Sequence, residues 1–165
     1  MRLTTRSNLA MRTLMHCAVN AHQMVRKHEI AAACNASENH LGQVIHRLSQ
    51  LGYLRTLRGR AGGVTLGRPM EEIRVGEVLR KFETSLPFAE CFSDSENTCP
   101  LVAGCRLRPA LAAAFDAFFD ALVPVTLSDL VVGNDCLDRI MRLPEGMGRR
   151  LPEAMMPCPH ALAPA

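Results

Sequence analysis

The fold of this chain is decided by residues 37–66, which read SENHLGQVIHRLSQLGYLRTLRGRAGGVTL. In the first part of this stretch, apolar residues recur every three or four positions, which is the spacing of one helix face. Ser37 precedes them as a good N-cap, and Gly52 follows them where a helix end favours glycine. The apolar stripe consists of Leu41, Val44, Ile45, Leu48 and Leu51. These residues therefore predict one amphipathic helix that ends at Gly52.

The second part of the stretch predicts a β-hairpin. Residues 53–58 alternate in the way of a half-buried strand, and residues 64–66 resume that pattern. Between them, residues 59–63 include glycines, which readily adopt the positive φ angles of a tight turn. A hairpin with a basic, glycine-rich tip therefore follows the helix directly.

Further helices are predicted around this stretch. Helical spacing covers residues 7–20, with Ser7 or Asn8 available as N-cap, and a short helical pattern covers residues 27–34. Residues 73–82 predict another helix. The order helix, turn, helix, hairpin is that of a winged helix–turn–helix. We therefore expect a fold that is mainly α with a small β-hairpin wing.

The longest apolar stripe of the chain lies over residues 107–122. Its face is broader than a surface helix needs, so we expect a long dimerisation helix, with packing inside its own domain as the alternative. Prolines and glycines crowd the residues after Leu143, which predicts a disordered tail. The expected organisation is a winged helix–turn–helix domain over 1–82 (helix–turn–helix about 28–51, wing about 53–67), a cysteine loop over 83–106, a dimerisation helix region over 107–140 and a tail over 141–165.

The charge of the chain is divided unequally between its halves. The 165 residues carry 19 Lys and Arg against 16 Asp and Glu, a formal net charge of +3. Residues 1–80 hold 12 basic and 5 acidic side chains, whereas residues 81–165 hold 7 and 11. Most of the basic residues are arginines, which suit phosphates and guanine edges, although a GC-rich genome also favours arginine codons. We therefore expect the first half to face a polyanion.

Length and hydropathy exclude several classes of protein. A chain of 165 residues fits one compact domain with an appendage, and it is too short for a large multidomain enzyme. The longest uncharged stretch, residues 13–25, is shorter than the roughly 18 residues that span a bilayer. Arginines also interrupt the N-terminal residues, which argues against a secretory signal. We expect a cytoplasmic protein without a membrane partner.

A winged helix–turn–helix places its candidate DNA contacts at two positions. The second helix of the motif presents its N-terminal residues to base edges in the major groove, and the wing tip lies against neighbouring phosphates or the minor groove. Short polar and amide side chains at that helix start suit base edges, with ordinary solvated surface as the alternative. The residues predicted to bind DNA are Ser37, Asn39, His40 and Gln43 on the helix, and Arg58, Gly59 and Arg60 on the wing.

Three of the seven cysteines, Cys91, Cys99 and Cys105, form a C-x7-C-x5-C pattern in an irregular acidic stretch. Without a secretory signal, the readings that remain are metal binding, redox switching and coincidence. Thiolates are the soft donors that iron–sulfur clusters and zinc require, and zinc sites more often pair cysteines two residues apart. An iron–sulfur cluster therefore ranks first. Its fourth ligand is open among Glu90, Asp94, Glu96, a group from elsewhere in a dimer and a small molecule.

Catalysis has little support in the sequence. A phosphate-binding glycine loop and an H-E-x-x-H motif are both missing, and no base is placed beside a candidate cysteine nucleophile. The histidines near the N-terminus fit solvated surface or helix packing better than catalysis. They are His16, His22, His28 and His46. We therefore predict that the chain is not an enzyme.

The order of these features resembles the Rrf-two (BadM-type) winged-helix regulators over about residues 1–140. The resemblance is carried by MRLT at 1–4, RGRAGGVTLG at 58–67, the cysteine loop, and TLSDLV at 126–131. It implies a homodimer whose long helices cross, with a cluster on Cys91, Cys99 and Cys105 near the DNA-binding heads. It also implies a repressor that binds a palindromic operator on double-stranded DNA.

Within this family, SENHL at residues 37–41 looks most like the NsrR group, which loses DNA affinity when nitric oxide attacks its cluster. The resemblance favours a 4Fe–4S cluster over a 2Fe–2S cluster. Asn8 stands at the position of the NsrR aspartate ligand, and Arg108 at that of the IscR histidine ligand. Asn8 and the cysteine spacing also resemble RirA, so iron-responsive or general redox regulation is the alternative. A different class, a cluster-free thiol redox or metal-binding interaction protein, also stays open.

Overall fold

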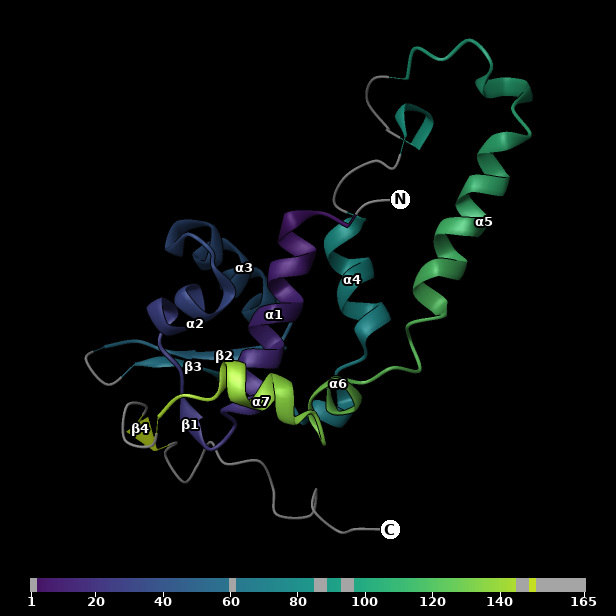
Figure 1. Ribbon diagram of the computed structural model, residues 1–165. Helices are drawn as coiled ribbons and strands as arrows, with labels where there is room; N and C mark the ends of the chain where they lie inside the picture. Colours follow the sequence, from purple (N-terminus) through teal and green to yellow (C-terminus); the bar gives the residue numbers. More distant parts are fainter. Residues whose placement is uncertain (1–2, 60–61, 85–88, 93–96, 145–148, 151–165) are drawn as a thin grey trace.

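The helix–turn–helix forms where the sequence predicts it (Figure 1). The computed structural model describes residues 3–59, 62–84, 89–92, 97–144 and 149–150. Helices α2 (Lys27–Cys34) and α3 (Glu38–Gln50) are joined by a turn in which Asn35 is left-handed, with φ +48°. The Ser37 hydroxyl accepts a hydrogen bond from the His40 N–H, so Ser37 is the N-cap of α3. Gly52, with φ +76°, follows the helix end as predicted.

The predicted hairpin consists of β2 (Leu54–Leu57) and β3 (Gly63–Leu66), which pair antiparallel with Leu54 opposite Leu66. Its turn requires glycine, because a Cβ at Gly62 would lie 2.2 Å from the carbonyl oxygen of Leu57. A short strand, β1 (Gln23–Met24), precedes α2, and Val25 beside it forms a bridge with Val64 of the hairpin. The wing is therefore anchored to the start of the helix–turn–helix.

The first helix, α1 (Thr5–Val19), packs against α2, α3, α4 and α6 at the centre of the molecule. It begins earlier than the apolar periodicity predicts, because Thr4 and not Ser7 or Asn8 is the N-cap. The Thr4 hydroxyl accepts from the Ser7 N–H at 3.2 Å, and the Thr4 N–H donates to Glu83 at 2.8 Å. The core around α1 contains Leu9, Leu14, Ile30, Leu41, Val44, Leu48, Tyr53, Ile73, Val78 and Phe119.

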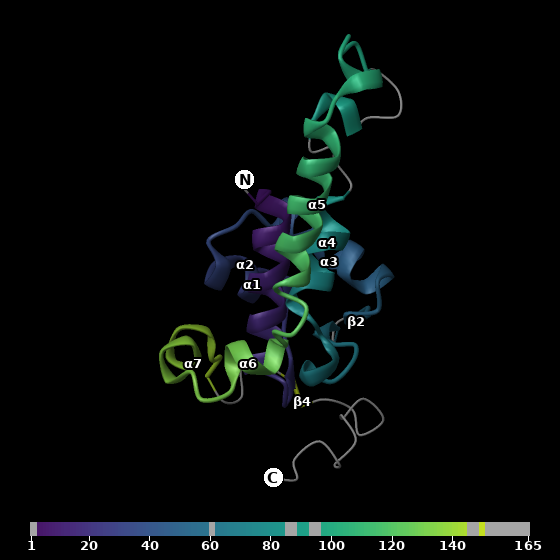
Figure 2. The ribbon, with the colours of Figure 1, turned by 90° about the vertical axis from the view of Figure 1, so that its right-hand side faces the viewer.

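Two further helices connect this core to the cysteine loop. A 3-10 turn, η1 (Met70–Glu72), leads into α4 (Val75–Glu83), and α5 (Leu107–Asp120) runs away from the core beside it (Figures 1 and 2). The loop includes the 3-10 turns η2 (Glu90–Phe92) and η3 (Val102–Gly104) at the far end of α5. Arg80 joins α4 to α5 through salt bridges of 2.5 Å to Asp116 and 2.7 Å to Asp120.

The C-terminal part of the chain returns to the core. It contains α6 (Leu127–Val131) and α7 (Asp135–Met141), so the predicted dimerisation region holds two short helices besides α5. The expectation that no element follows Leu143 is wrong at one place, since β4 (Arg149–Arg150) pairs antiparallel with β1. Backbone pairing to an available strand edge can form two-residue strands that show no sequence alternation. The rest of the predicted tail, 145–148 and 151–165, lies outside the described residues.

The observed architecture is mainly α with a small antiparallel wing, as predicted. Within the described ranges, no helix combines the length and apolarity needed to cross a bilayer.

Candidate DNA-binding surface and cysteine loop

The start of α3 presents the predicted base-reading residues on the surface of the motif. Asn39 and Gln43 are exposed, and His40 is half-buried. Ser37 is also exposed, but its hydroxyl oxygen already accepts the capping hydrogen bond from His40. Asn39 and Gln43 therefore present exposed amide groups that can form hydrogen bonds to base edges.

The wing tip supplies the second predicted contact. Arg58 and Gly59 are both exposed, and Gly59 has φ +105°, a conformation that favours glycine. Arg60 lies outside the described residues. The tip therefore offers a guanidinium next to backbone that carries no Cβ, an arrangement suited to close approach to phosphates.

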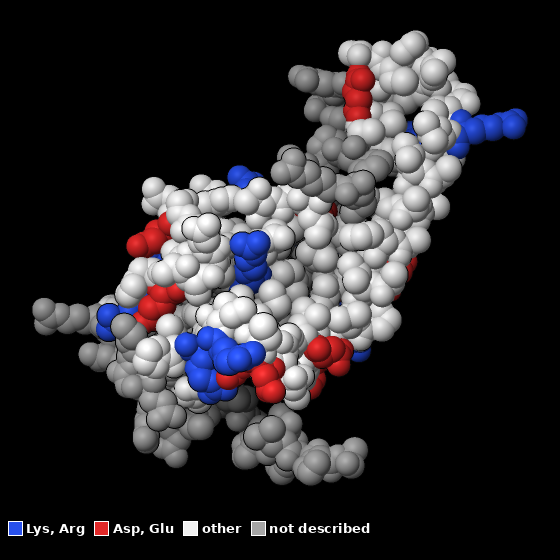
Figure 3. Space-filling model, in the orientation of Figure 1, with Lys and Arg blue, Asp and Glu red and all other residues white. Residues whose placement is uncertain are grey.

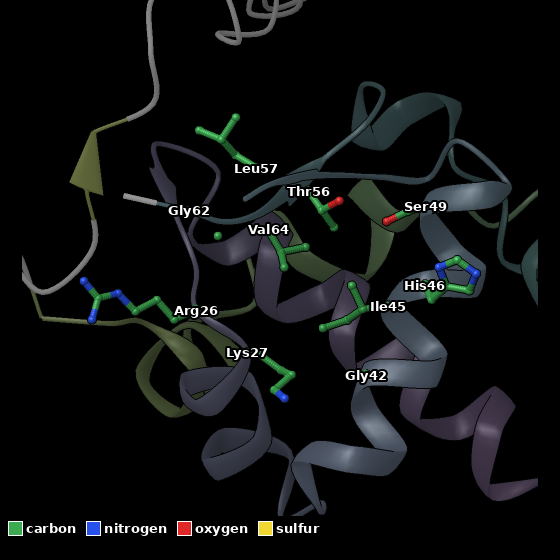
Figure 4. Close-up of a pocket in the computed structure, with 11 residues that line it drawn as sticks. Arg26, Lys27, Gly42, Ile45, His46, Ser49, Thr56, Leu57, Gly62 and Val64 are labelled. Atoms are coloured by element: carbon green, nitrogen blue, oxygen red, sulfur yellow. The ribbon is translucent and has the colours of Figure 1, made fainter. Parts of the chain in front are cut away.

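The structure adds a basic site that the sequence analysis missed. A pocket lies between the start of α2, the face of α3 and the wing, and its lining includes Arg26, Lys27 and His46 (Figure 4). All three side chains are exposed, and Lys27 also makes a 3.2 Å salt bridge to Glu38. The positive charges of Arg26 and Lys27 suit phosphate oxygens beside α3. The signal in the sequence was the basic pair at 26–27 directly before the second helix.

Two cysteines are core residues. Cys17 and Cys34 are buried between helices, with 1% and 3% of their surfaces exposed. Burial raises the pKa of the Cys17 thiol to about 12, and the neighbouring Cys34 contributes in the same direction. Burial also raises the pKa of Cys34, partly opposed by Arg12. Both thiols therefore stay protonated at neutral pH and are poor metal ligands.

The three loop cysteines differ from these core thiols in their exposure. Cys91, Cys99 and Cys105 are all half-buried near the far end of α5. In the described part of the chain, no three Cys, His, Asp or Glu side chains are gathered closely enough to hold a metal ion. The three residues thus share one loop and suitable donor chemistry, but they do not form a preassembled site.

One contact orders this loop. A carboxylate oxygen of Glu90 accepts hydrogen bonds from both the N–H and the hydroxyl of Thr98, each at 2.6 Å. These two bonds lower the pKa of Glu90 below its ordinary value. Glu90 precedes Cys91, and Thr98 precedes Cys99, so the contact draws the two cysteine-bearing segments together.

The positions considered for a fourth ligand are spread over the molecule. Asn8 is exposed on the first turns of α1, and the Arg108 guanidinium lies 5.6 Å from the centre of the Phe92 ring. Asp94 and Glu96 lie outside the described residues. Arg108 therefore packs on the cysteine loop as a cation over an aromatic face, which is not a ligand role.

The histidines have the environments that the sequence predicts. His22, His28 and His46 are exposed, and His16 is buried in the helix packing. Neither ring nitrogen of His16 has a hydrogen-bond partner among the described residues. Burial accordingly lowers its pKa, with a smaller opposing effect from Glu29.

The face of α5 that does not pack against the core is exposed to solvent. Phe119 is the one fully buried residue of this helix, whose residues are all described. Leu107 is 63% exposed, and Leu101, in the turn before the helix, is 69% exposed. Along α5 the surface in Figure 3 is mostly uncharged, with basic side chains near its upper end. A single copy of the chain therefore leaves an apolar helix face uncovered.

Comparisons with known proteins agree with this architecture. The chain matches the Rrf2 (Rrf-two) family, described as "Iron-dependent Transcriptional regulator", over residues 3–133. It is 42% identical over 145 residues to "Protein aau3" of Rhizobium meliloti, which covers 88% of this chain and 94% of that protein. It is 37% identical over 142 residues to "HTH-type transcriptional regulator NsrR" of Bacillus licheniformis, which covers 86% of this chain and 99% of that protein.

Among solved structures, "T. potens IscR" superimposes with a TM-score of 0.63 at 22% sequence identity, which covers 87% of this chain and 94% of that one. This likeness confirms the fold. The family match spans most of the chain, and its residues include the helix–turn–helix, the wing and α5. The predicted absence of enzymatic function agrees with a family of regulators. The chain belongs to the Rrf2 family of DNA-binding transcriptional regulators.

Proposed function

We propose that this chain is a cytoplasmic, homodimeric repressor that senses nitric oxide through an iron–sulfur cluster held by Cys91, Cys99 and Cys105. The observation that carries the proposal is the distribution of its thiols. Two are buried with raised pKa values, while three half-buried thiols share the loop that leads into α5. The likeness to proteins named NsrR supports the same assignment.

The donor set fits an iron–sulfur cluster in its chemistry. Three thiolates on one loop are suitable soft ligands for either cluster type, and the resemblance to the NsrR group favours 4Fe–4S over 2Fe–2S. A bound cluster would supply iron that reacts with nitric oxide. The chain's own contribution is to hold the three sulfurs and to connect their loop to the rest of the molecule.

The second copy is expected to cover the exposed face of α5. In the first turns of this helix Leu107 is exposed and Leu111 is half-buried. Full burial of an exposed leucine contributes about 1.5 to 3 kcal/mol, so these two partly exposed side chains together contribute on the order of 2 to 4 kcal/mol. Two copies would present two helix–turn–helix motifs to a palindromic operator, with half-sites about one helical turn apart.

Packed helices connect the cysteine loop to the DNA-binding surface, so a change in the loop can reach α3. The loop leads into α5, which Arg80 joins to α4 through Asp116 and Asp120. Helix α4 packs on α1, and α1 packs on α3. A hundredfold loss of operator affinity corresponds to a coupling of about 2.7 kcal/mol, within the usual range for allosteric proteins.

The contacts to DNA would come from two places on each copy. Ser37, Asn39, His40 and Gln43 would read base edges from the start of α3. Arg58, Gly59 and Arg60 would contact phosphates or the minor groove. The pocket residues Arg26 and Lys27 extend this basic surface into the space between α2, α3 and the wing.

The test is an operator-binding titration of anaerobically purified protein, followed by absorbance. We expect iron and sulfide in the protein, tight binding to the operator, and loss of both absorbance and affinity on adding nitric oxide. Loss of affinity with an iron chelator, but not with nitric oxide, would instead support an iron-responsive regulator. Protein without iron or sulfide that binds its operator equally tightly would contradict the proposal and favour a cluster-free thiol regulator.

A further inference from the structure

The contact between Glu90 and Thr98 concentrates two hydrogen bonds on one carboxylate oxygen. The Thr98 N–H and hydroxyl both donate to it at 2.6 Å. Both residues are exposed, and water competes for hydrogen bonds at the surface. Two hydrogen bonds to the same oxygen therefore hold this contact better than one bond would. Because one donor is backbone, the contact fixes the course of the chain as well as a side chain.

Cys99 is held by the residues around it. The side-chain oxygen of Asn97 accepts a 3.1 Å hydrogen bond from the Cys99 N–H. The Cys99 carbonyl oxygen accepts from the Val102 N–H at 3.4 Å. On the other side, the Phe92 N–H donates to Ala89 at 2.9 Å within the turn that contains Cys91. Each cysteine thus sits in its own short turn, and the contact of Glu90 with Thr98 joins the two turns.

We propose that Glu90 is a positioning residue, whose carboxylate binds Thr98 and holds Cys91 beside Cys99 before any metal is bound. This inference rests on the proposed function, because it concerns two of the three cysteines of the cluster site. It gives Glu90 a different role from the fourth ligand considered in the sequence analysis. In this role its Oε1 accepts both hydrogen bonds from Thr98.

The two roles make opposite demands on residue 90. A positioning residue needs an oxygen that accepts hydrogen bonds, and the side-chain carbonyl of glutamine supplies one. An iron ligand needs a carboxylate, which glutamine lacks. Glu90→Gln should therefore keep the positioning function, whereas Glu90→Ala should abolish it. Thr98→Ser retains both donors, and Thr98→Val removes the hydroxyl donor alone.

The decisive measurement uses the metal-free, reduced protein. Dibromobimane becomes fluorescent when it bridges two neighbouring thiols, and mass spectrometry of the digested product identifies the bridged pair. We expect a bridge between Cys91 and Cys99 in the parent chain and in Glu90→Gln. In Glu90→Ala its rate should fall about tenfold, because both hydrogen bonds to residue 90 are lost. Thr98→Ser should match the parent, and Thr98→Val should lie between.

A second measurement records the absorbance of anaerobically reconstituted protein. Glu90→Gln should load iron as the parent does, and Glu90→Ala should load more slowly. Equal bridging rates in Glu90→Ala and the parent would overturn the inference. So would iron loading that fails in Glu90→Gln while bridging stays normal, because that result identifies a ligand. If the parent binds no iron but Glu90→Ala still slows bridging, the proposed function fails and the positioning role stands.

Discussion

The side-chain amide of Asn20 donates a 2.8 Å hydrogen bond to the backbone carbonyl of Met141, 121 positions later in the chain. Its side-chain oxygen accepts from the Leu143 N–H at 2.9 Å. Asn20 is fully buried, with 0% of its surface exposed. One side chain at the end of α1 thus satisfies a backbone group in the last residue of α7 and another two residues later, and fixes the C-terminal segment next to β1.

Replacing Asn20 with alanine should lower the free energy of unfolding by about 2 kcal/mol, because the Met141 carbonyl and the Leu143 N–H lose their partner. Urea unfolding curves measure this change. Asn39→Ala is the matched control, since Asn39 is exposed on α3 and its loss should change stability by less than about 0.5 kcal/mol. Equal stability of the two variants would show that Asn20 does not hold the segment.

Local periodicity was enough to predict α2, α3, the hairpin and the region of α5. Each of these elements carries an apolar stripe or alternation within its own residues, so neighbouring positions reveal it. Thr4 does not follow from periodicity as the cap of α1, because residues 5–8 are all polar and the apolar stripe starts only at Leu9. Strands β1 and β4 are too short for any alternation to show.

The candidate site was predictable only in part. The C-x7-C-x5-C spacing identified the cysteines, since donor chemistry can be read from residue types. The contact between Glu90 and Thr98 could not be read in this way, because two polar residues in an irregular loop have no characteristic spacing. The pocket beside Arg26 and Lys27 was missed because it depends on how the wing folds against α3.

Cys99→Ala should remove the iron–sulfur absorbance and the response of operator binding to nitric oxide, while leaving a folded dimer. The reason is that a half-buried loop thiol contributes little to the core but supplies one of the three sulfurs. Anaerobic absorbance measures the cluster, operator binding with and without nitric oxide measures the response, and circular dichroism measures the fold. Cys136→Ala is the control, because this thiol is exposed on α7. Unchanged iron absorbance in Cys99→Ala would exclude Cys99 as a ligand.

Acidification should destabilise the fold through His16. Burial lowers the pKa of this imidazole below its ordinary value of 6.5, so the unfolded chain binds a proton that the folded chain does not. The stabilising effect of the neutral ring is complete above pH 6.5 and declines as the pH falls through the lower, folded-state pKa.

His16→Leu should therefore show a smaller loss of stability than the parent between about pH 7 and pH 5. Denaturant midpoints at both pH values give the comparison. The exposed His22 provides the control, because His22→Leu should keep the pH dependence of the parent. The same decline in His16→Leu and the parent would assign the acid sensitivity to other groups.

Arg58→Ala should weaken operator binding by about tenfold and reduce the slope of log affinity against log salt by about one, the effect of losing one phosphate contact. Arg58 is exposed at the wing tip, so the change should leave the fold and the cluster absorbance intact. Arg139→Ala, an exposed arginine on α7, should retain full affinity. Fluorescence anisotropy at several salt concentrations would record this difference, and an unchanged slope would remove the wing from the interface.

Leu111→Glu should convert the protein from dimer to monomer. Leu111 is half-buried in one copy and does not belong to the packed core, so a charge there is tolerated until a second α5 covers it. Ile140→Glu is the matched control, since Ile140 is 66% exposed on α7, away from α5. Sedimentation equilibrium measures the association of both variants.

The same pair of variants also tests how dimerisation contributes to DNA binding. A monomer can occupy only one half-site, so Leu111→Glu should lose most of the operator affinity while its unfolding midpoint stays close to that of the parent. Ile140→Glu should bind as the parent does. A dimer that persists in Leu111→Glu, or dissociates in Ile140→Glu, would place the subunit interface on a different surface from α5.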